Sequence, residues 1–313
     1  MNEHETRVTG GLSLLQARGG RYGDKVYVCA RGFRHYVPSI DRLAKYGLRW
    51  PEDLIQVPDT VLGSFAVGGW LPTLYANDEA SLQPIQSSLV MREYLASNLR
   101  GMGLEVGAGA SPFPVPLRCR VLFGDRLSHE ELVAQLYPGQ REFELVCPDV
   151  ITNFDSFDGI ADESLDFIIG CHVIEHVSNP IGTLVNAHRK LRSGGVLVLV
   201  VPDSSRTFDR DRPLTSLDHL KLDYLAPDPT RDRQHYEEFY RLAFKTPEAE
   251  LHQKVENEYA RRGDLHMHVW SYESFGEVVS YVDRNLCQWS EKWSHPTLPD
   301  VQHDIEFYFR LTK

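Results

Sequence analysis

The stretch Gly103-Leu-Glu105-Val-Gly107-Ala-Gly109-Ala-Ser111-Pro112 decides the fold of this chain. A short apolar segment leads into two glycines that are separated by one residue, a pattern typical of a buried strand that turns sharply at its carboxyl end. A turn without side chains lets a ligand approach the backbone. A dinucleotide-binding loop would continue with a third glycine into a close-packed helix, but Ser111 and Pro112 stand there. The loop therefore indicates a ligand without a pyrophosphate, which disfavours an NAD oxidoreductase.

The segments around this stretch predict a sheet that is mostly parallel. Apolar runs of strand length alternate with helical stretches, and this arrangement is typical of a parallel sheet covered on both faces. We expect strands over 103–106, 121–123, 165–169, 196–201, 287–293 and 305–311, and helices over 85–99, 130–136, 181–191 and 272–284. Such sheets bind ligands at the carboxyl ends of their strands.

Acidic residues stand at the ends of the first two of these strands. Glu105 lies two residues before the first glycine, where a carboxylate can pair with a cationic amino group. Asp125 follows Gly107 by 18 residues, the interval expected for a carboxylate that accepts hydrogen bonds from ribose hydroxyls. A cationic amino acid joined to a nucleoside describes S-adenosylmethionine, which we therefore expect as the cofactor.

Three further motifs make the sequence resemble the class I S-adenosylmethionine-dependent methyltransferases, type 11-like members in particular. These motifs are Asp149-Val-Ile-Thr-Asn153-Phe154-Asp155, the segment 164–177 with Cys171-His172, and the segment 191–203 with Gly194-Gly195. Their joint order and spacing are more specific than any single motif. The resemblance implies a Rossmann-like α/β fold with a seven-stranded sheet and a terminal antiparallel strand, and it implies methyltransferase activity.

The resemblance also implies where the cofactor binds. Asn153 and Phe154 would contact adenine; the family often has Asp at the first of these positions, but an amide oxygen can still accept from the adenine amino group. The cofactor residues that we expect are Glu105, Gly107, Ala108, Gly109, Asp125, Arg126, Asn153, Phe154 and Cys171.

A narrower resemblance concerns the methyl acceptor. The segments 105–112, 209–219 and 266–270 recur together in bacterial methyltransferases associated with polysaccharide and glycan biosynthesis. This subgroup implies O-methylation of a sugar or glycan precursor. The alternatives are N- or O-methylation of a small natural product, and a catalytically silent cofactor-binding protein on the same fold.

A hydroxyl acceptor needs a base, which is most often a histidine. Our first choice is His219, in a charged segment that forms either a solvated helix or a lid over the acceptor. His172, after the fourth strand, and His268 are the other candidates, whereas Glu175 and His176 are expected to be structural.

The pair His266 and His268 also raises the question of a metal site. Alternation along a strand would place both side chains on one face, with Asp203 or Asp218 as a further ligand. Two ligands without a third at a characteristic spacing are weak evidence, so we expect no metal. A packed hinge, or a sugar-binding platform of His268, Trp270 and Tyr272, is the favoured interpretation.

The amino-acid composition limits the kinds of binding partner and the cellular compartment that we expect for this protein. The chain has 33 basic and 44 acidic residues and a formal net charge of −11, which disfavours nucleic acid as a partner. No apolar run has the ~20 residues needed to span a membrane, no signal peptide is visible, and the five cysteines form no Cys-x-x-Cys pair. We expect a cytoplasmic protein that is either a homo-oligomer or associated with glycan-biosynthesis enzymes. A sugar nucleotide would require positive charge from Arg206, Arg210, Arg212 or Lys221.

The domain organisation follows from these motifs. We expect a flexible N-terminus over 1–24, a small accessory module over 25–69, a linker over 70–80, and a methyltransferase domain over 81–313 with an acceptor-side insertion at about 205–270. In the module we expect strands over 25–29 and 34–37, and a helix over 39–47 that Ser39 caps and Gly47 ends.

Overall fold

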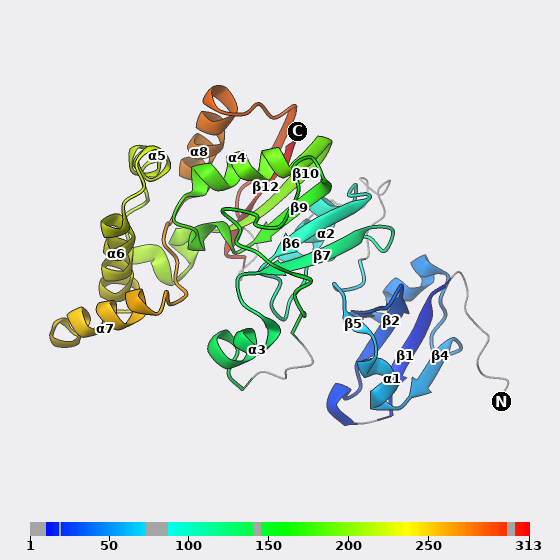
Figure 1. The fold of residues 1–313 in the computed structure, drawn as a ribbon. Coiled ribbons are helices and arrows are strands. Elements are labelled where there is room, and N and C mark those ends of the chain that lie inside the picture. Colours follow the sequence, from blue (N-terminus) through cyan, green and yellow to red (C-terminus); the bar gives the residue numbers. More distant parts are fainter. Residues whose placement is uncertain (1–10, 19, 73–86, 140–144, 299–303) are drawn as a thin grey trace.

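Two β-sheets organise the molecule (Figure 1). The computed structural model describes residues 11–18, 20–72, 87–139, 145–298 and 304–313. A seven-stranded sheet flanked by helices makes up most of these residues, and a five-stranded sheet lies toward the N-terminus. No helix within the described ranges combines the length and the apolarity that crossing a membrane requires.

The larger sheet has the strand order β11-β12-β10-β9-β6-β7-β8. Its strands are Met102–Val106 (β6), Arg120–Asp125 (β7), Val150–Ile151 (β8), Leu165–Cys171 (β9), Leu191–Pro202 (β10), Glu291–His295 (β11) and Glu306–Thr312 (β12). Strands β6 to β10 run parallel to one another, whereas β12 runs antiparallel to both β10 and β11. This confirms the predicted α/β methyltransferase fold. The strand expected over 287–293 begins later, because the N–H of Cys287 still bonds back to Val282 at the end of the preceding helix.

Each face of this sheet carries its own apolar core, because successive side chains of a strand point to opposite faces. Ile168 and Leu199 pack under α4 and α8, whereas Phe167 and Val198 pack against α2 on the other face. These helices are α2 (Ser88–Ala96), α4 (Pro180–Lys190) and α8 (Tyr272–Asn285). The sheet is therefore buried on both sides, which is why its strands are apolar throughout.

Short helical turns follow several strands, and a helical insertion separates β10 from α8. The turns are α3 (His129–Glu131), its continuation η4 (Leu132–Leu136) and η6 (Ile174–His176). The insertion comprises η7 (Ser204–Arg206), η8 (Phe208–Asp211), α5 (Leu217–Leu225), α6 (Pro229–Glu238), η9 (Phe239–Ala243) and α7 (Glu248–Ala260). Helices α6 and α7 pack on each other through a small core that includes Tyr236 and Val255. Figure 1 shows these helices, in yellow and orange, projecting beside the sheet.

The N-terminal sheet has the order β4-β1-β2-β3-β5. Its elements are β1 (Ser13–Ala17), η1 (Gly20–Tyr22), β2 (Val26–Ala30), β3 (Phe33–Tyr36), η2 (Ile40–Tyr46), β4 (Leu54–Val57), α1 (Asp59–Gly63) and β5 (Ala66–Val67). The expectation that residues 1–24 are flexible is wrong from Ser13 onward. Strand β1 lies between β2 and β4, and Leu14 and Leu15 are buried in the two cores of this unit.

The helix expected over 39–47 is the 3-10 helix η2. It ends at Gly47, whose φ of 72° is the left-handed conformation that glycine adopts readily. Ser39 precedes it without a capping hydrogen bond, so that part of the prediction is wrong.

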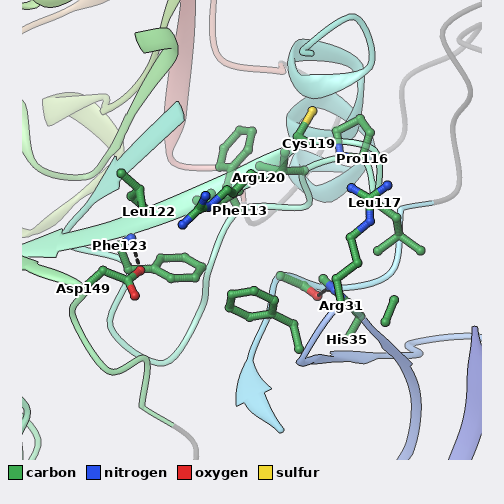
Figure 2. A pocket seen from close by; sticks show the side chains of 16 residues that line it. Arg31, His35, Phe113, Pro116, Leu117, Cys119, Arg120, Leu122, Phe123 and Asp149 are labelled. Atoms are coloured by element: carbon green, nitrogen blue, oxygen red, sulfur yellow. Dashed lines mark hydrogen bonds between the residues drawn. The ribbon is translucent and has the colours of Figure 1, made fainter. Parts of the chain in front are cut away.

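The two sheets meet through direct contacts. Arg42 Nη1 lies 2.9 Å from Glu93 Oε1 on α2, and Gly69 lies so close to Phe113 that a Cβ there would come within 2.1 Å of the Phe113 oxygen. A cavity of about 400 Å³ lies at this junction, and Figure 2 shows Arg31 and His35 of the N-terminal unit facing it. Of the linker expected over 70–80, residues 73–80 lie outside the described part of the chain.

Candidate active site

A cavity of about 780 Å³ opens at the carboxyl ends of the parallel strands. One wall comes from the ends of β6, β7 and β9 and from the loop after β8, and the other comes from α6, the end of α7 and the segment 262–267. This is the edge at which open α/β sheets bind ligands.

Glycines shape the loop after β6. Gly107 and Gly109 have φ values of 70° and 51°, in the left-handed region that favours glycine. A Cβ at Gly109 would lie 2.2 Å from the Tyr137 hydroxyl oxygen, and one at Gly107 would lie 2.9 Å from Val173. The two positions flanking Ala108 therefore require glycine.

Glu105 lies beneath this loop and is almost completely buried. Its Oε1 accepts a hydrogen bond of 2.8 Å from the Phe113 N–H, and its Oε2 has no hydrogen-bond partner among the described residues. Burial raises the pKa of this carboxyl to about 8, against the opposing effects of the Phe113 N–H and Arg92. A cationic amino group could pair with the unpartnered Oε2 and would favour the ionised form of this carboxyl, although Glu105 does not line the cavity.

Asp125 and Arg126 follow β7 at the cavity wall. Asp125 is buried and uses Oδ1 to accept a 3.1 Å hydrogen bond from the Leu127 N–H, and burial raises its pKa. Arg126 Nη2 lies 3.7 Å from Asp264 Oδ1 on the opposite wall. Asp125 thus stands where ribose hydroxyls would be bound.

Of three further residues predicted to bind the cofactor, two line the cavity and one packs in the core. Asn153 is exposed at the cavity and Phe154 packs against Gly170, where a Cβ would come within 2.3 Å of the ring. Cys171 packs in the core beneath α2, outside the cavity lining, and burial raises the pKa of its thiol. The glycines, the buried carboxylates and the open wall at Asn153 together fit S-adenosylmethionine.

His172 lines the cavity on the side of β9. Its φ of 55° is unusual for a residue with a side chain. Its Nε2 lies 2.7 Å from Glu306 Oε2, and Glu306 also accepts a 2.9 Å hydrogen bond from Arg92 Nε. Burial would raise the pKa of Glu306, but the hydrogen bonds from His172 and Arg92 outweigh burial and lower it to about 2.

Next to His172, three imidazoles surround the buried carboxylate of Glu175. His172 Nδ1, His176 Nε2 and His266 Nε2 lie 3.7, 3.8 and 3.9 Å from Glu175 Oε1. On their outer sides, His176 Nδ1 lies 3.2 Å from Asp264 Oδ1 and His266 Nδ1 lies 2.6 Å from Asp209 Oδ2. Glu175, His176 and His266 could hold a cation. Sequence reasoning did not find this group, because His266 is far along the chain from Glu175.

His219 and His268 lie outside the cavity lining, in a second histidine cluster behind its wall. The expectation that His266 and His268 share one face is wrong, because the segment is not a strand and each residue belongs to a different cluster. The sugar-binding platform is also wrong, because His268 and Trp270 are 0% and 1% exposed.

The basic residues expected to attract a sugar nucleotide do not line the cavity. Arg212 is buried in an ion pair with Asp209, Arg206 donates to the Asp304 carbonyl, and Lys221 pairs with Asp218. The charged groups that do line the cavity are Asp125, Arg126, Asp155, Asp232, Arg262 and Asp264. Carboxylates therefore outnumber guanidinium groups there.

Comparison with known proteins identifies the family. The family model described as a methyltransferase domain matches residues 88–292. No curated protein sequence matches the chain.

Solved structures of several methyltransferases resemble the fold at low sequence identity. The CurJ carbon methyltransferase has 14% identity and a TM-score of 0.40 over 72% of this chain, which spans only 53% of that protein's chain. A possible histamine N-methyltransferase from Thermotoga maritima has 17% identity and a TM-score of 0.37. This match covers 68% of this chain and 82% of that protein's chain. The plantazolicin methyltransferase BpumL, solved with S-adenosylhomocysteine, has 12% identity and a TM-score of 0.38. This match covers 76% of this chain and 87% of that protein's chain. Because the family match spans more than half of its residues, this chain belongs to the methyltransferase-domain family, the class I enzymes that use S-adenosylmethionine as methyl donor.

Proposed function

We propose that this protein methylates a hydroxyl group of a small, neutral, polar acceptor such as a sugar or a glycan precursor. The observation that carries the proposal is the two-sided cavity. One wall has Gly107, Asp125 and Asn153, which suit the cofactor, and the other has polar side chains from the insertion. Its volume of about 780 Å³ lies within the range of small-molecule sites.

The charge of the cavity supports a neutral acceptor. Asp155, Asp232 and Asp264 supply carboxylates, which accept hydrogen bonds from hydroxyls. Burial would raise the pKa of Asp264, but His176 and Arg126 lower it, so this carboxylate is ionised. Negative charge at this wall would repel the phosphates of a sugar nucleotide. The net charge of −11 acts in the same direction.

His172 is the best candidate for accepting the proton of the hydroxyl. It is the member of the predicted set His172, His219 and His268 that lines the cavity. Glu306 at 2.7 Å from Nε2 favours the tautomer that carries the proton there, which leaves the lone pair of Nδ1 free to accept a proton. The cofactor supplies a methyl group activated by a sulfonium. The cavity walls hold the acceptor in line with that group, and such positioning supplies much of the rate.

The same carboxylates favour a second candidate, N-methylation of an amine. A cationic amine would be attracted to Asp155, Asp232 and Asp264. It needs less help from a base than a hydroxyl does, so the effect of substituting His172 separates the two activities.

A transfer assay with S-adenosylmethionine labelled in its methyl group tests the proposal. The full chain is incubated with neutral glycosides, with sugar nucleotides and with amines, and the labelled products are identified by mass spectrometry. We expect an O-methyl ether of a neutral glycoside. Label on an amine would establish the second candidate instead. Cofactor binding without transfer to any class would indicate a silent protein, and no binding at ~1 mM cofactor by calorimetry would contradict the enzyme assignment.

A further inference from the structure

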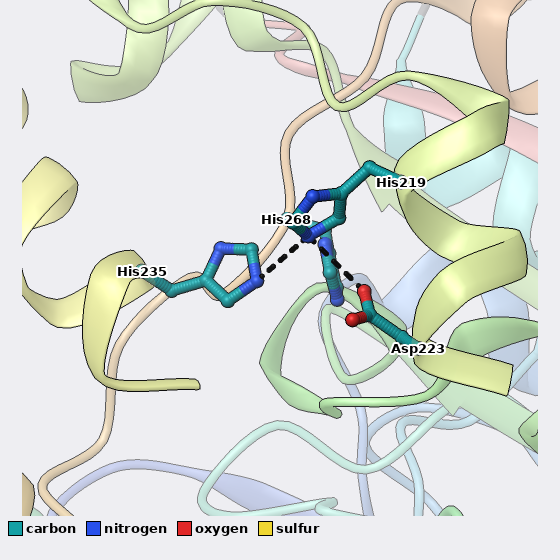
Figure 3. A group of neighbouring side chains, drawn as sticks. All are labelled: His219, Asp223, His235 and His268. Atoms are coloured by element: carbon teal, nitrogen blue, oxygen red, sulfur yellow. Dashed lines mark hydrogen bonds and ion pairs between the residues drawn. The ribbon is translucent and has the colours of Figure 1, made fainter. Parts of the chain in front are cut away.

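We propose that His219, Asp223, His235 and His268 form a binding site for one divalent transition-metal ion, of which Zn²⁺ is the best match. Each residue offers one ligand atom, and these four atoms lie within 4.8 Å of one another. Figure 3 shows the four side chains converging from α5, α6 and the segment before α8. This inference does not depend on the proposed methyl acceptor.

The local structure explains why these side chains converge. His219 and Asp223 are four residues apart on α5 and therefore lie on the same face of the helix. His219 Nε2 lies 3.1 Å from Asp223 Oδ2 and 3.1 Å from His235 Nε2 on α6. The His268 ring completes the group, with its centroid 4.6 Å from that of His235.

Hydrogen bonds within the protein do not satisfy all the nitrogen atoms of this cluster. His268 is 0% exposed, and its Nδ1 has no hydrogen-bond partner among the described residues. A buried nitrogen without a hydrogen-bond partner destabilises the folded state. The two Nε2 atoms of His219 and His235 face each other and can share only one proton. A cation that accepts lone pairs from all three imidazoles would satisfy these atoms together.

The protonation states match those that a metal needs, namely neutral imidazole and ionised carboxylate. Burial lowers the pKa of His235 to about 4 and that of His268 well below its ordinary value. Burial would raise the pKa of Asp223, but the hydrogen bonds from His219 and Arg231 lower it. Three imidazole nitrogens and one carboxylate oxygen are a donor set typical of Zn²⁺.

Outer partners orient two of the ligands, as is common around metal ions. Arg231 Nε donates a 2.7 Å hydrogen bond to Asp223 Oδ1, which leaves Oδ2 directed toward the histidines. His268 Nε2 lies 3.4 Å from the Ser178 carbonyl oxygen, so Nδ1 remains as the ligand atom. The His219 side chain is 30% exposed, which provides a path for the ion from solvent.

The proposed site adjoins the cavity without belonging to it. Three residues that line the cavity are next to the proposed ligands. Ser178 contacts His268 through its carbonyl oxygen, Met267 precedes His268 in the sequence, and Tyr236 follows His235. A bound ion would therefore join α5, α6 and the segment 262–268 and hold the acceptor wall in place. The sequence spacing predicts no such site, because its ligands come from three separated segments.

Calorimetric titration of the chelator-treated full chain with ZnCl₂ tests this inference, with metal content measured by mass spectrometry. We expect one Zn²⁺ per chain and a rise in melting temperature on binding. Asp223→Asn and His235→Gln should weaken binding by more than ~100-fold. Arg231→Gln should weaken it by about 10-fold, because outer partners typically contribute 10–100-fold.

His266→Gln is the matched control, because His266 belongs to the neighbouring Glu175 group. It should leave Zn²⁺ affinity unchanged. Substituting Co²⁺ for Zn²⁺ gives visible absorption that reports the ligands directly, so a variant with reduced stability is still informative. Absence of stoichiometric binding by the intact chain would overturn the inference. So would binding that survives both Asp223→Asn and His235→Gln, or binding that is lost in His266→Gln instead.

Discussion

His172 combines an unusual backbone conformation with a central position at the cavity. Its φ is 55°, and its N–H bonds to the Val200 carbonyl at 2.9 Å. A strained residue held by surrounding contacts is a frequent feature of functional sites. The imidazole also lies between the carboxylates of Glu306 and Glu175, which restrict its orientation.

Replacing His172 with Asn removes the basic nitrogen while keeping a residue type that tolerates positive φ. If His172 accepts the proton, kcat should fall by about 10²–10⁴-fold, KM should change little, and the acidic limb of the pH–rate profile should disappear. His188→Asn on α4, a partly buried histidine outside the cavity lining, is the control. A kcat within twofold of the wild type would assign the role to another group, with His176→Asn as the next variant to measure, because His176 also lines the cavity.

Gly109 and Gly139 allow a matched test of the glycine loop. Both have positive φ, 51° and 81°, so Ala strains the backbone at either position by about 1–2 kcal/mol. At Gly109 the new Cβ would collide, 2.2 Å from the Tyr137 hydroxyl oxygen, whereas at Gly139 no atom of the described residues lies within 4 Å. We expect Gly109→Ala to weaken cofactor binding at least tenfold by calorimetry and Gly139→Ala to leave it unchanged. Equal effects would show that the loop does not contact the cofactor.

Glu306 makes the stability of the fold depend on pH. Its pKa is about 2 in the folded protein against an ordinary value of 4.5, so its stabilisation is complete above about pH 4.5 and is lost as pH falls toward 2. The loss amounts to roughly 3 kcal/mol. Glu306→Gln should be less stable at pH 7, because Arg92 loses its partner, and should show a shallower decline between pH 5 and 3. Denaturant unfolding at several pH values measures both effects; parallel curves for the two proteins would contradict the assignment.

At the scale of elements, two serines that precede helices differ in whether they make a capping hydrogen bond. Ser271 opens α8 with a full capping box, in which its side chain accepts from the Ser274 N–H while the Ser274 side chain accepts from the Ser271 N–H. Ser39 occupies the corresponding place before η2 but makes no such bond. The residue type is the same, and only the geometry differs.

These two serines give a paired prediction. Ser271→Ala should lower the free energy of unfolding by about 1 kcal/mol, whereas Ser39→Ala should change it by less than ~0.5 kcal/mol. Urea unfolding of the two variants beside the wild type provides the measurement. A larger loss for Ser39→Ala would mean that its hydroxyl has a role other than capping.

At the scale of the whole molecule, the contact between Arg42 and Glu93 joins the two sheets. The Glu93 side chain is 0% exposed and that of Arg42 is 14% exposed, so the pair is largely screened from water. Removing Arg42 is costly, because the buried Glu93 side chain loses this charged contact between the two units.

Arg42→Met should therefore lower the free energy of unfolding by about 3 kcal/mol while leaving cofactor affinity unchanged, since both residues lie outside the cavity lining. Chemical unfolding and cofactor calorimetry on the same preparation separate the two quantities. Arg49→Met, which removes an exposed ion pair with Asp53 in the same unit, is the control and should leave the free energy of unfolding nearly unchanged. A loss of cofactor affinity in Arg42→Met would show that the N-terminal unit supports the active site.

The sequence by itself determined the methyltransferase sheet and the loop at which we expect the cofactor to bind. Strand–glycine–acid patterns such as 103–109 and 121–125 are local, because backbone sterics and alternating apolar residues act between near neighbours. It did not reveal β1, because a strand of five residues has weak periodicity and the sequence on both sides of it is rich in glycine.

Only the tertiary structure decided which side chains line the cavity and which lie behind it. It separated His266 from His268, buried Arg212, and placed His172 rather than His219 at the cavity. It also assembled Asp223 and His235 with two distant histidines. Such groupings depend on how the insertion helices pack on one another and on the sheet. Packing joins segments that are far apart in the chain, and the spacing of residues along a single sequence carries no record of those distances.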